Sequence, residues 1–138
     1  MNIFDLQQRA AGFDLRLALT EVLLKMEQDV LNANREQMLY GFNADGSMIG
    51  RYKSELYAEG KYAMNPRAGF GNVDLRLTGA MFNSLYLDWE TYVNATVMYD
   101  LQEKYGENFL GIGGPYRLKV LNSFVPKAKE KLKKELTT

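Results

Sequence analysis

A stripe of apolar residues with helical spacing runs through the first third of the sequence. Successive members are four, three, four and four residues apart, which places their side chains on one face of an α-helix. They are Leu15, Leu19, Val22, Met26 and Val30. We therefore predict that residues 3–40 are helical. Gly12 is expected to separate a short first helix from a longer one capped by Asp14, and Gly41 is placed to end the longer one.

The sequence contains neither histidine nor cysteine among its 138 residues. Their absence removes the commonest general base and metal ligand, and with them disulfides and thiolate metal sites. Lys+Arg and Asp+Glu each number 17, so the net charge is zero and nucleic-acid binding through an overall basic charge is not expected. With 46% hydrophobic residues, we expect a single domain, 1–138, with its own core.

The start of the sequence shows no basic segment followed by an apolar run, and no apolar run approaches the roughly 20 residues of a membrane helix. We therefore expect no secretory signal and no membrane partner. The protein is predicted to act in a cytoplasm, or to be assembled there into a larger structure. Zero net charge gives little protection against self-association, which favours an assembly subunit.

Residues 42–76 are expected to form an extended, irregular interaction arm. The pair Asp45-Gly46 is typical of a turn, and Asn65-Pro66 disfavours helix. The stretch between these pairs is expected to make one or two helical turns, with Tyr57 and Lys61 on one face. Irregular segments of this length in small domains are usually functional or become ordered on a partner.

Residues 84–100 alternate apolar and polar side chains and are predicted to form an antiparallel β-hairpin that turns near Glu90–Tyr92. Thr78 is expected to cap one helical turn before the first strand, which begins at Ser84. Residues 115–136 are predicted to form a C-terminal helix, with a kink or a break at Pro126. The predicted fold class is therefore α+β.

Several residues could carry chemistry, and each has a simpler structural interpretation. Glu55 with Glu59, and Asp88 with Glu90, have spacings seen in metal and acid–base sites. Solvated charges at these spacings are far more common, and no further ligand accompanies them. A serine nucleophile would have to rely on lysine, for example Ser54 with Lys53 or Lys61, and no phosphate-binding loop is present. We therefore expect no enzymatic activity, no cofactor and no metal.

The nine tyrosines are the most unusual part of the composition, and several lie between residues 40 and 62. They fit either a subunit interface or local packing, because the ring is apolar and the hydroxyl polar. The candidate interface residues are Tyr52, Tyr57, Lys61, Tyr62 and Phe70. The lysine-rich tail from Lys127 to Thr138 fits either an ordinary helix end or a nucleic-acid contact.

The order of these features resembles a group of small structural proteins of tailed bacteriophages, namely the virion-morphogenesis, tail-completion and head–tail joining proteins. In that group a long helix is followed by an Asp-Gly turn, a Leu-x-x-Thr-Gly-x-Leu-x-x-Ser motif, a hairpin, a Phe-Leu-Gly loop and a final helix. Met81 stands where the motif usually has leucine. The matching residues are Asp45, Gly46, Leu75, Thr78, Gly79, Ser84, Phe109, Leu110 and Gly111.

The resemblance implies a non-enzymatic virion protein, assembled in the host bacterial cytoplasm as part of a ring at the neck or tail end. Its partners would be further copies of itself and the portal, neck or tail proteins, with DNA in the channel. Two other functions stay open from the residues themselves. One is a small nucleic-acid-binding accessory protein that uses the lysine-rich helix, and the other is a hydrolase with a carboxylate-bound metal.

Overall fold

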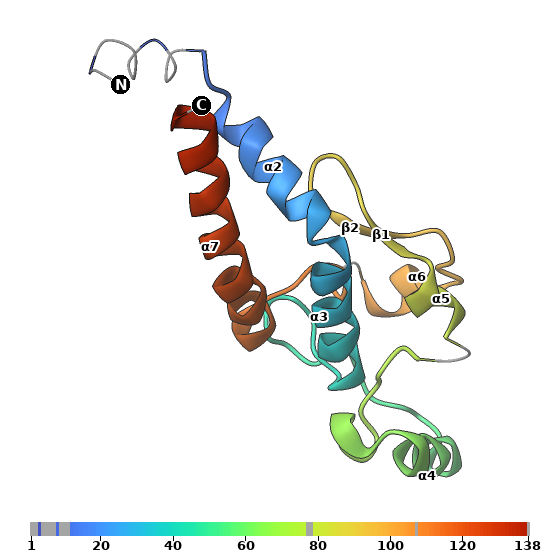
Figure 1. The fold of residues 1–138 in the computed structure, drawn as a ribbon. Coiled ribbons are helices and arrows are strands. Elements are labelled where there is room, and N and C mark those ends of the chain that lie inside the picture. Colours follow the sequence, from blue (N-terminus) through green and yellow to red (C-terminus); the bar gives the residue numbers. More distant parts are fainter. Residues whose placement is uncertain (1–2, 4–7, 9–11, 77–78, 107, 138) are drawn as a thin grey trace.

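The computed structural model describes residues 3, 8, 12–76, 79–106 and 108–137. It combines helices with one two-stranded antiparallel sheet, so the α+β prediction is confirmed at this level (Figure 1). The elements are α2 (Leu15–Lys25), α3 (Glu27–Leu39), α4 (Glu55–Met64), η1 (Pro66–Ala68), α5 (Ala80–Asn83), β1 (Leu85–Leu87), β2 (Val93–Ala95), α6 (Leu101–Tyr105) and α7 (Gly114–Thr137).

The long apolar stripe forms two successive helices, α2 and α3. Asp14 caps α2 as predicted, because its carboxylate accepts a hydrogen bond of 3.0 Å from the Leu17 N–H. The predicted continuity is wrong at Met26, whose ψ of 17° interrupts the helix. Most of the predicted helical residues before Gly12 lie outside the described residues.

The end of α3 is a Schellman motif around Gly41. The Phe42 N–H bonds the Gln37 carbonyl at 3.1 Å, and the Gly41 N–H bonds the Met38 carbonyl at 2.9 Å. Gly41 has a φ of +85°, which glycine adopts without the steric cost that a Cβ imposes. The predicted helix stop is therefore confirmed, and the chain leaves α3 in a fixed direction.

The predicted hairpin is present but shorter than residues 84–100. Leu85 pairs with Ala95 and Leu87 with Val93, and the apolar side chains Leu85, Leu87 and Val93 face the core. The second strand was expected to extend to Tyr99 and does not. Tyr99 has a φ of +54°, and the chain there turns into α6.

Helix α7 packs along α2 and α3 and runs antiparallel to α2 (Figure 1). It begins and ends within one residue of the predicted bounds, and it continues without a break through Pro126. Proline leaves the Asn122 carbonyl without its helical donor. Both residues are exposed, so water can take the place of the missing donor.

Segment 42–76 is more regular than the predicted arm. Helix α4 has ten residues, longer than the one or two turns expected, because Ser54 caps its first turn by accepting from the Tyr57 N–H at 3.2 Å. Isolated bridges join Phe42 to Met48 and Arg51 to Asn72. The segment therefore folds back on itself and places α4 at one end of the molecule, away from α7 and the hairpin (Figure 1).

Candidate functional site

Two buried amide side chains on α3 hold the loop that carries Phe109 to Gly113. Asn34 donates to the Phe109 carbonyl at 2.8 Å and accepts from the Gly111 N–H at 2.7 Å. Gln37, one helical turn later, donates to the Gly111 carbonyl and accepts from the Gly113 N–H, both at 2.9 Å. Four backbone groups of an irregular loop are thereby satisfied inside the protein.

Sequence reasoning missed both amides. The available signal was their position, because Asn34 and Gln37 lie among the buried residues of α3 between Leu31 and Met38. Polar residues at core-facing helix positions must find buried partners. Here the partners are the Phe-Leu-Gly loop, with the Phe109 side chain fully buried beside them.

The same loop contacts the predicted Asp45-Gly46 turn. The Ala44 N–H bonds the Asn108 carbonyl at 2.7 Å, and a Cβ on Gly113 would lie 1.7 Å from the Ala44 carbonyl oxygen. The Asp45 carboxylate accepts from the Ser47 hydroxyl and the Ser47 N–H, which lowers the pKa of Asp45. The structure thus brings together the Asp45-Gly46 turn and the Phe-Leu-Gly loop, which are far apart in the sequence.

The central motif, Leu75 to Ser84, is described in part. Leu75 is buried with a φ of +61°, and Gly79, at +88°, takes the N-cap position of α5. Thr78, predicted as that cap, lies outside the described residues. The Ser84 hydroxyl donates to the Met81 carbonyl at 2.8 Å and accepts from the Val97 N–H at 3.0 Å, so it fastens the start of the hairpin to its end.

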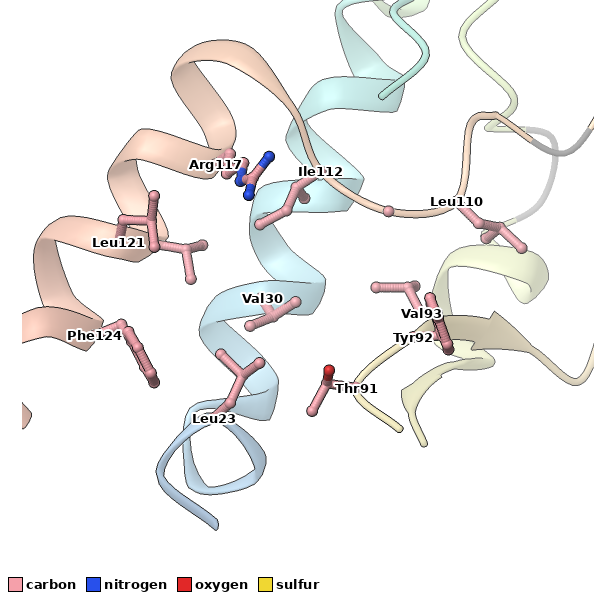
Figure 2. Close-up of a pocket in the computed structure, with 12 residues that line it drawn as sticks. Leu23, Val30, Thr91, Tyr92, Val93, Leu110, Ile112, Arg117, Leu121 and Phe124 are labelled. Atoms are coloured by element: carbon pink, nitrogen blue, oxygen red, sulfur yellow. The ribbon is translucent and has the colours of Figure 1, made fainter. Parts of the chain in front are cut away.

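An apolar groove of about 470 Å³ opens between α2–α3, the hairpin turn, the 109–113 loop and the first half of α7. Figure 2 shows Leu121 and Phe124 reaching toward it from α7, opposite Tyr92 and Val93 of the hairpin. Arg117 is the one charged residue among the described lining residues. We call this hollow the groove; its lining residues are Leu23, Val30, Thr91, Tyr92, Val93, Leu110, Gly111, Ile112, Arg117, Val120, Leu121 and Phe124.

Apolar side chains also remain exposed on both walls of the groove. On α7, Leu118, Leu121 and Val125 have exposed fractions of 58%, 40% and 44% and fall on one helical face. At the hairpin turn, Trp89 and Tyr92 are exposed as well. The groove is therefore flanked by exposed apolar side chains on α7 and at the hairpin turn, and exposed apolar surface of this kind marks interaction sites.

A second apolar surface lies on α4. Leu56 and Met64 have exposed fractions of 80% and 77% although both lie within a helix. They are eight residues apart and share one side of α4 with Gly60 and, at the edge, Tyr57. We call these four residues the α4 face; with Lys61 and Arg76 they line an open hollow of about 550 Å³.

The inner side of α4 is held by charges rather than by an apolar core. Lys61 Nζ lies 2.6 Å from Asp74 Oδ1, and Lys61 also donates to the Arg76 carbonyl. Asn65 donates to Asp74 Oδ2 at 2.9 Å and to the Leu39 carbonyl at 2.8 Å. This network fastens α4 to the extended chain at residues 74–76 and to the end of α3.

The candidate interface residues therefore separate into two groups. Lys61, a candidate interface residue, is buried in the ion pair with Asp74. Tyr52 is half-buried against Tyr57, with ring centroids 5.0 Å apart, and burial followed by the nearby Asp74 charge raises the pKa of Tyr52. Tyr57 is exposed, as are Tyr62 and Phe70, whose rings meet edge to face at 5.9 Å.

The acidic pairs considered as metal or acid–base sites either stabilise a turn or are exposed to solvent. Asp88 accepts from the N–H groups of Glu90 and Tyr92, both at 2.9 Å, and so shapes the hairpin turn. Glu55 and Glu59 are exposed on α4. Among the residues described, no three carboxylates are grouped as a metal site requires.

The lysine-rich end of α7 is partly tied to α2. Lys131 bonds Glu135 at 2.9 Å and Glu21 at 3.2 Å, and these two partners raise the pKa of Lys131. Lys127, Lys129 and Lys133 point to solvent.

Neither a protein-family model nor a curated protein nor a solved structure matches this chain. Within the described ranges, no helix has both the length and the apolar character needed to cross a membrane.

Proposed function

We propose that this protein is a structural virion protein of a tailed phage or prophage, forming part of a ring at the neck or at the head–tail or tail-completion interface. The observation that supports this most is the presence of two different apolar surfaces on one small chain, the groove and the α4 face. Two unlike surfaces suit a heterologous, head-to-tail contact, which closes into a ring when the rotation between copies permits.

The order of motifs supports the same proposal. Ala44, beside the Asp45–Gly46 turn, is bonded to Asn108, beside the Phe109–Gly111 loop, and the loop is bonded to Asn34 of α3. The loop supplies Leu110, Gly111 and Ile112 to the lining of the groove, and Ala44 beside the turn packs against the loop, so both have structural roles. In this proposal further copies of the chain are the first partners, and portal, neck or tail proteins bind the assembled ring.

The direct test is the mass of the purified protein by light scattering at several concentrations, with the same samples viewed by negative-stain microscopy. We expect multiples of 15.8 kDa that grow with concentration, and closed rings in the images. A mass of 15.8 kDa at every concentration, with no rings, would contradict self-assembly.

Exposed lysines on α7 favour a second candidate function, nucleic-acid binding by the monomer. Lys127, Lys129 and Lys133 lie on the solvent side of the helix end. This function predicts DNA affinity that falls steeply between about 50 and 200 mM salt, since each phosphate contact releases counterions. Fluorescence anisotropy with a labelled duplex separates the two candidates, because the ring proposal does not require tight DNA binding by a single copy.

A further inference from the structure

Within the described part of the chain, no segment covers the α4 face. Its inner side is fixed by the Lys61–Asp74 pair, so the helix cannot roll to bury Leu56 and Met64 without breaking a buried ion pair. Leu56, Gly60 and Met64 repeat every four residues, which is the anchor spacing of a helix that lies in an apolar groove.

The residues that the structure describes likewise leave the groove open. Its volume of about 470 Å³ falls within the range of pockets that bury a bound group. Hydrogen bonds from the side-chain amides of Asn34 and Gln37 hold the 109–113 loop in place, so this loop does not collapse to close the groove. Helix α4 lies at one end of the molecule, away from α7 and the hairpin (Figure 1), and none of its residues lines the groove of the same copy.

Glu59 flanks the α4 face and Arg117 lines the groove, so each surface carries one charge opposite to that of the other, while Arg76 also lies in the α4 hollow. The exposed charged residues of α4 are Glu55 and Glu59, because Lys61 is neutralised by Asp74. Helix α7 carries seven cationic and two acidic residues, and Arg117 lies at the groove itself. The hairpin turn adds Glu90 and Asp88, and the Asp88 carboxylate is already bonded to turn N–H groups. Complementary charge of this kind guides orientation and speeds association.

We propose that the α4 face of one copy occupies the groove of the next copy, with Glu59 directed toward Arg117. This inference rests on the proposed head-to-tail assembly and assigns its two contact surfaces. Leu56 and Met64 enter between α7 and the hairpin turn, where they cover Leu121 and Tyr92. Each copy then offers one helix and one groove, so every internal contact in the assembly is the same.

Cross-linking between single-cysteine variants tests the contact, since the natural sequence contains no cysteine. Leu56→Cys and Leu121→Cys are made in separate chains, mixed, and treated with a short bis-maleimide reagent. We expect a mixed dimer as the main product, and a ladder of linked copies when both changes are in one chain. Lys133→Cys, exposed near the other end of α7, replaces Leu121→Cys as the matched control and is expected to give little product.

The outcomes separate this inference from the proposed function. Rings by microscopy with no Leu56–Leu121 product would overturn the α4–groove contact and leave the ring proposal intact. A dominant Leu121–Leu121 product would show a symmetric α7 contact and overturn the inference. A wild-type protein that stays monomeric at every concentration, together with no cross-linked product, would overturn both.

Charge reversal gives an independent readout. Glu59→Lys is expected to weaken self-association about fivefold, as is Arg117→Glu, since a rim pair contributes roughly a factor of this size. Mixing the two variants is expected to restore association, because both contacts between unlike copies join opposite charges. Glu103→Lys on α6, with the same change of charge, is the control. Failure of the mixture to recover would count against the orientation proposed here.

Discussion

Lys61 Nζ lies 2.6 Å from Asp74 Oδ1, and both side chains are nearly excluded from solvent. This pair is one of the contacts that hold segment 42–76 in a folded rather than an extended form. It joins the middle of α4 to the chain that leads into α5, and Asn65 extends the network to the end of α3. The Lys61 charge, a candidate interface group from the sequence, instead fixes the position of the α4 face.

Breaking this pair on one side is expected to destabilise the protein strongly. Asp74→Ala leaves the Lys61 charge buried without an opposite charge, with the Arg76 carbonyl as its remaining partner, and we expect a loss of about 3–5 kcal/mol in the free energy of unfolding. Urea denaturation followed by circular dichroism measures the change. Lys104→Met, which removes an exposed pair with Asp100, is the control and should cost less than about 1 kcal/mol. Equal costs for the two variants would show that the buried pair has no special role.

Removing the Asn34 amide is expected to loosen the groove wall. Asn34→Leu leaves the Phe109 carbonyl and the Gly111 N–H without partners, which should cost about 2–4 kcal/mol. Asn32→Ala, on the exposed side of the same helix, should change stability by less than about 1 kcal/mol. Thermal unfolding of the three proteins side by side checks the difference, and a stable Asn34→Leu variant would mean that the loop is held by Gln37 alone.

Two glycine-to-alanine changes should have opposite effects. At Gly113 a Cβ would meet the Ala44 carbonyl oxygen at 1.7 Å, so Gly113→Ala must push the 43–46 turn away from the loop. At Gly60 nothing lies within 4 Å of the new Cβ, and alanine in an exposed helix should raise stability by about 0.5–1 kcal/mol. The midpoints of chemical denaturation should move in opposite directions. A neutral Gly113→Ala variant would rule out the close approach.

Tyr52 should make stability fall at alkaline pH. Burial, followed by the Asp74 charge, raises the pKa of Tyr52 above its ordinary value of about 10. Above that pH the unfolded chain releases the Tyr52 proton while the folded chain retains it, so the stabilisation is complete below about pH 10 and is lost as pH rises. Denaturation at a series of alkaline pH values should show a shallower fall for Tyr52→Phe than for the wild type. An equal fall in stability with pH for the two proteins would contradict this role of Tyr52 ionisation.

Features with a local cause were predictable from the sequence. Asp14 caps α2 through its own side chain, and Gly41 ends α3 because glycine alone adopts its backbone angle without strain. The hairpin follows from alternation around a turn that Asp88 stabilises within four residues of sequence.

Features that depend on distant partners were not predictable. The interruption at Met26 has no local signal, and beside it Glu27 accepts the Leu87 N–H across sixty residues of sequence. The burial of Lys61 depends on Asp74, and the role of Asn34 depends on a loop seventy-five residues away. The groove itself needs α2, α3, α7 and the hairpin together, so no single segment of sequence contains it.

The first turns of α2 and the last turns of α7 are expected to open more easily than the rest of the fold. Few side chains are buried there, chiefly Ala18, Val22 and Ala128, while Leu15 and Leu17 stay largely in solvent. Helix α3, by contrast, has Leu31, Asn34, Gln37 and Met38 almost completely enclosed. Regions with little buried apolar surface open at low free energy. Amide hydrogens in the first turns of α2 and the last turns of α7 should therefore exchange with solvent long before those of α3. Local unfolding should begin at this end of the two helices while α3 stays folded.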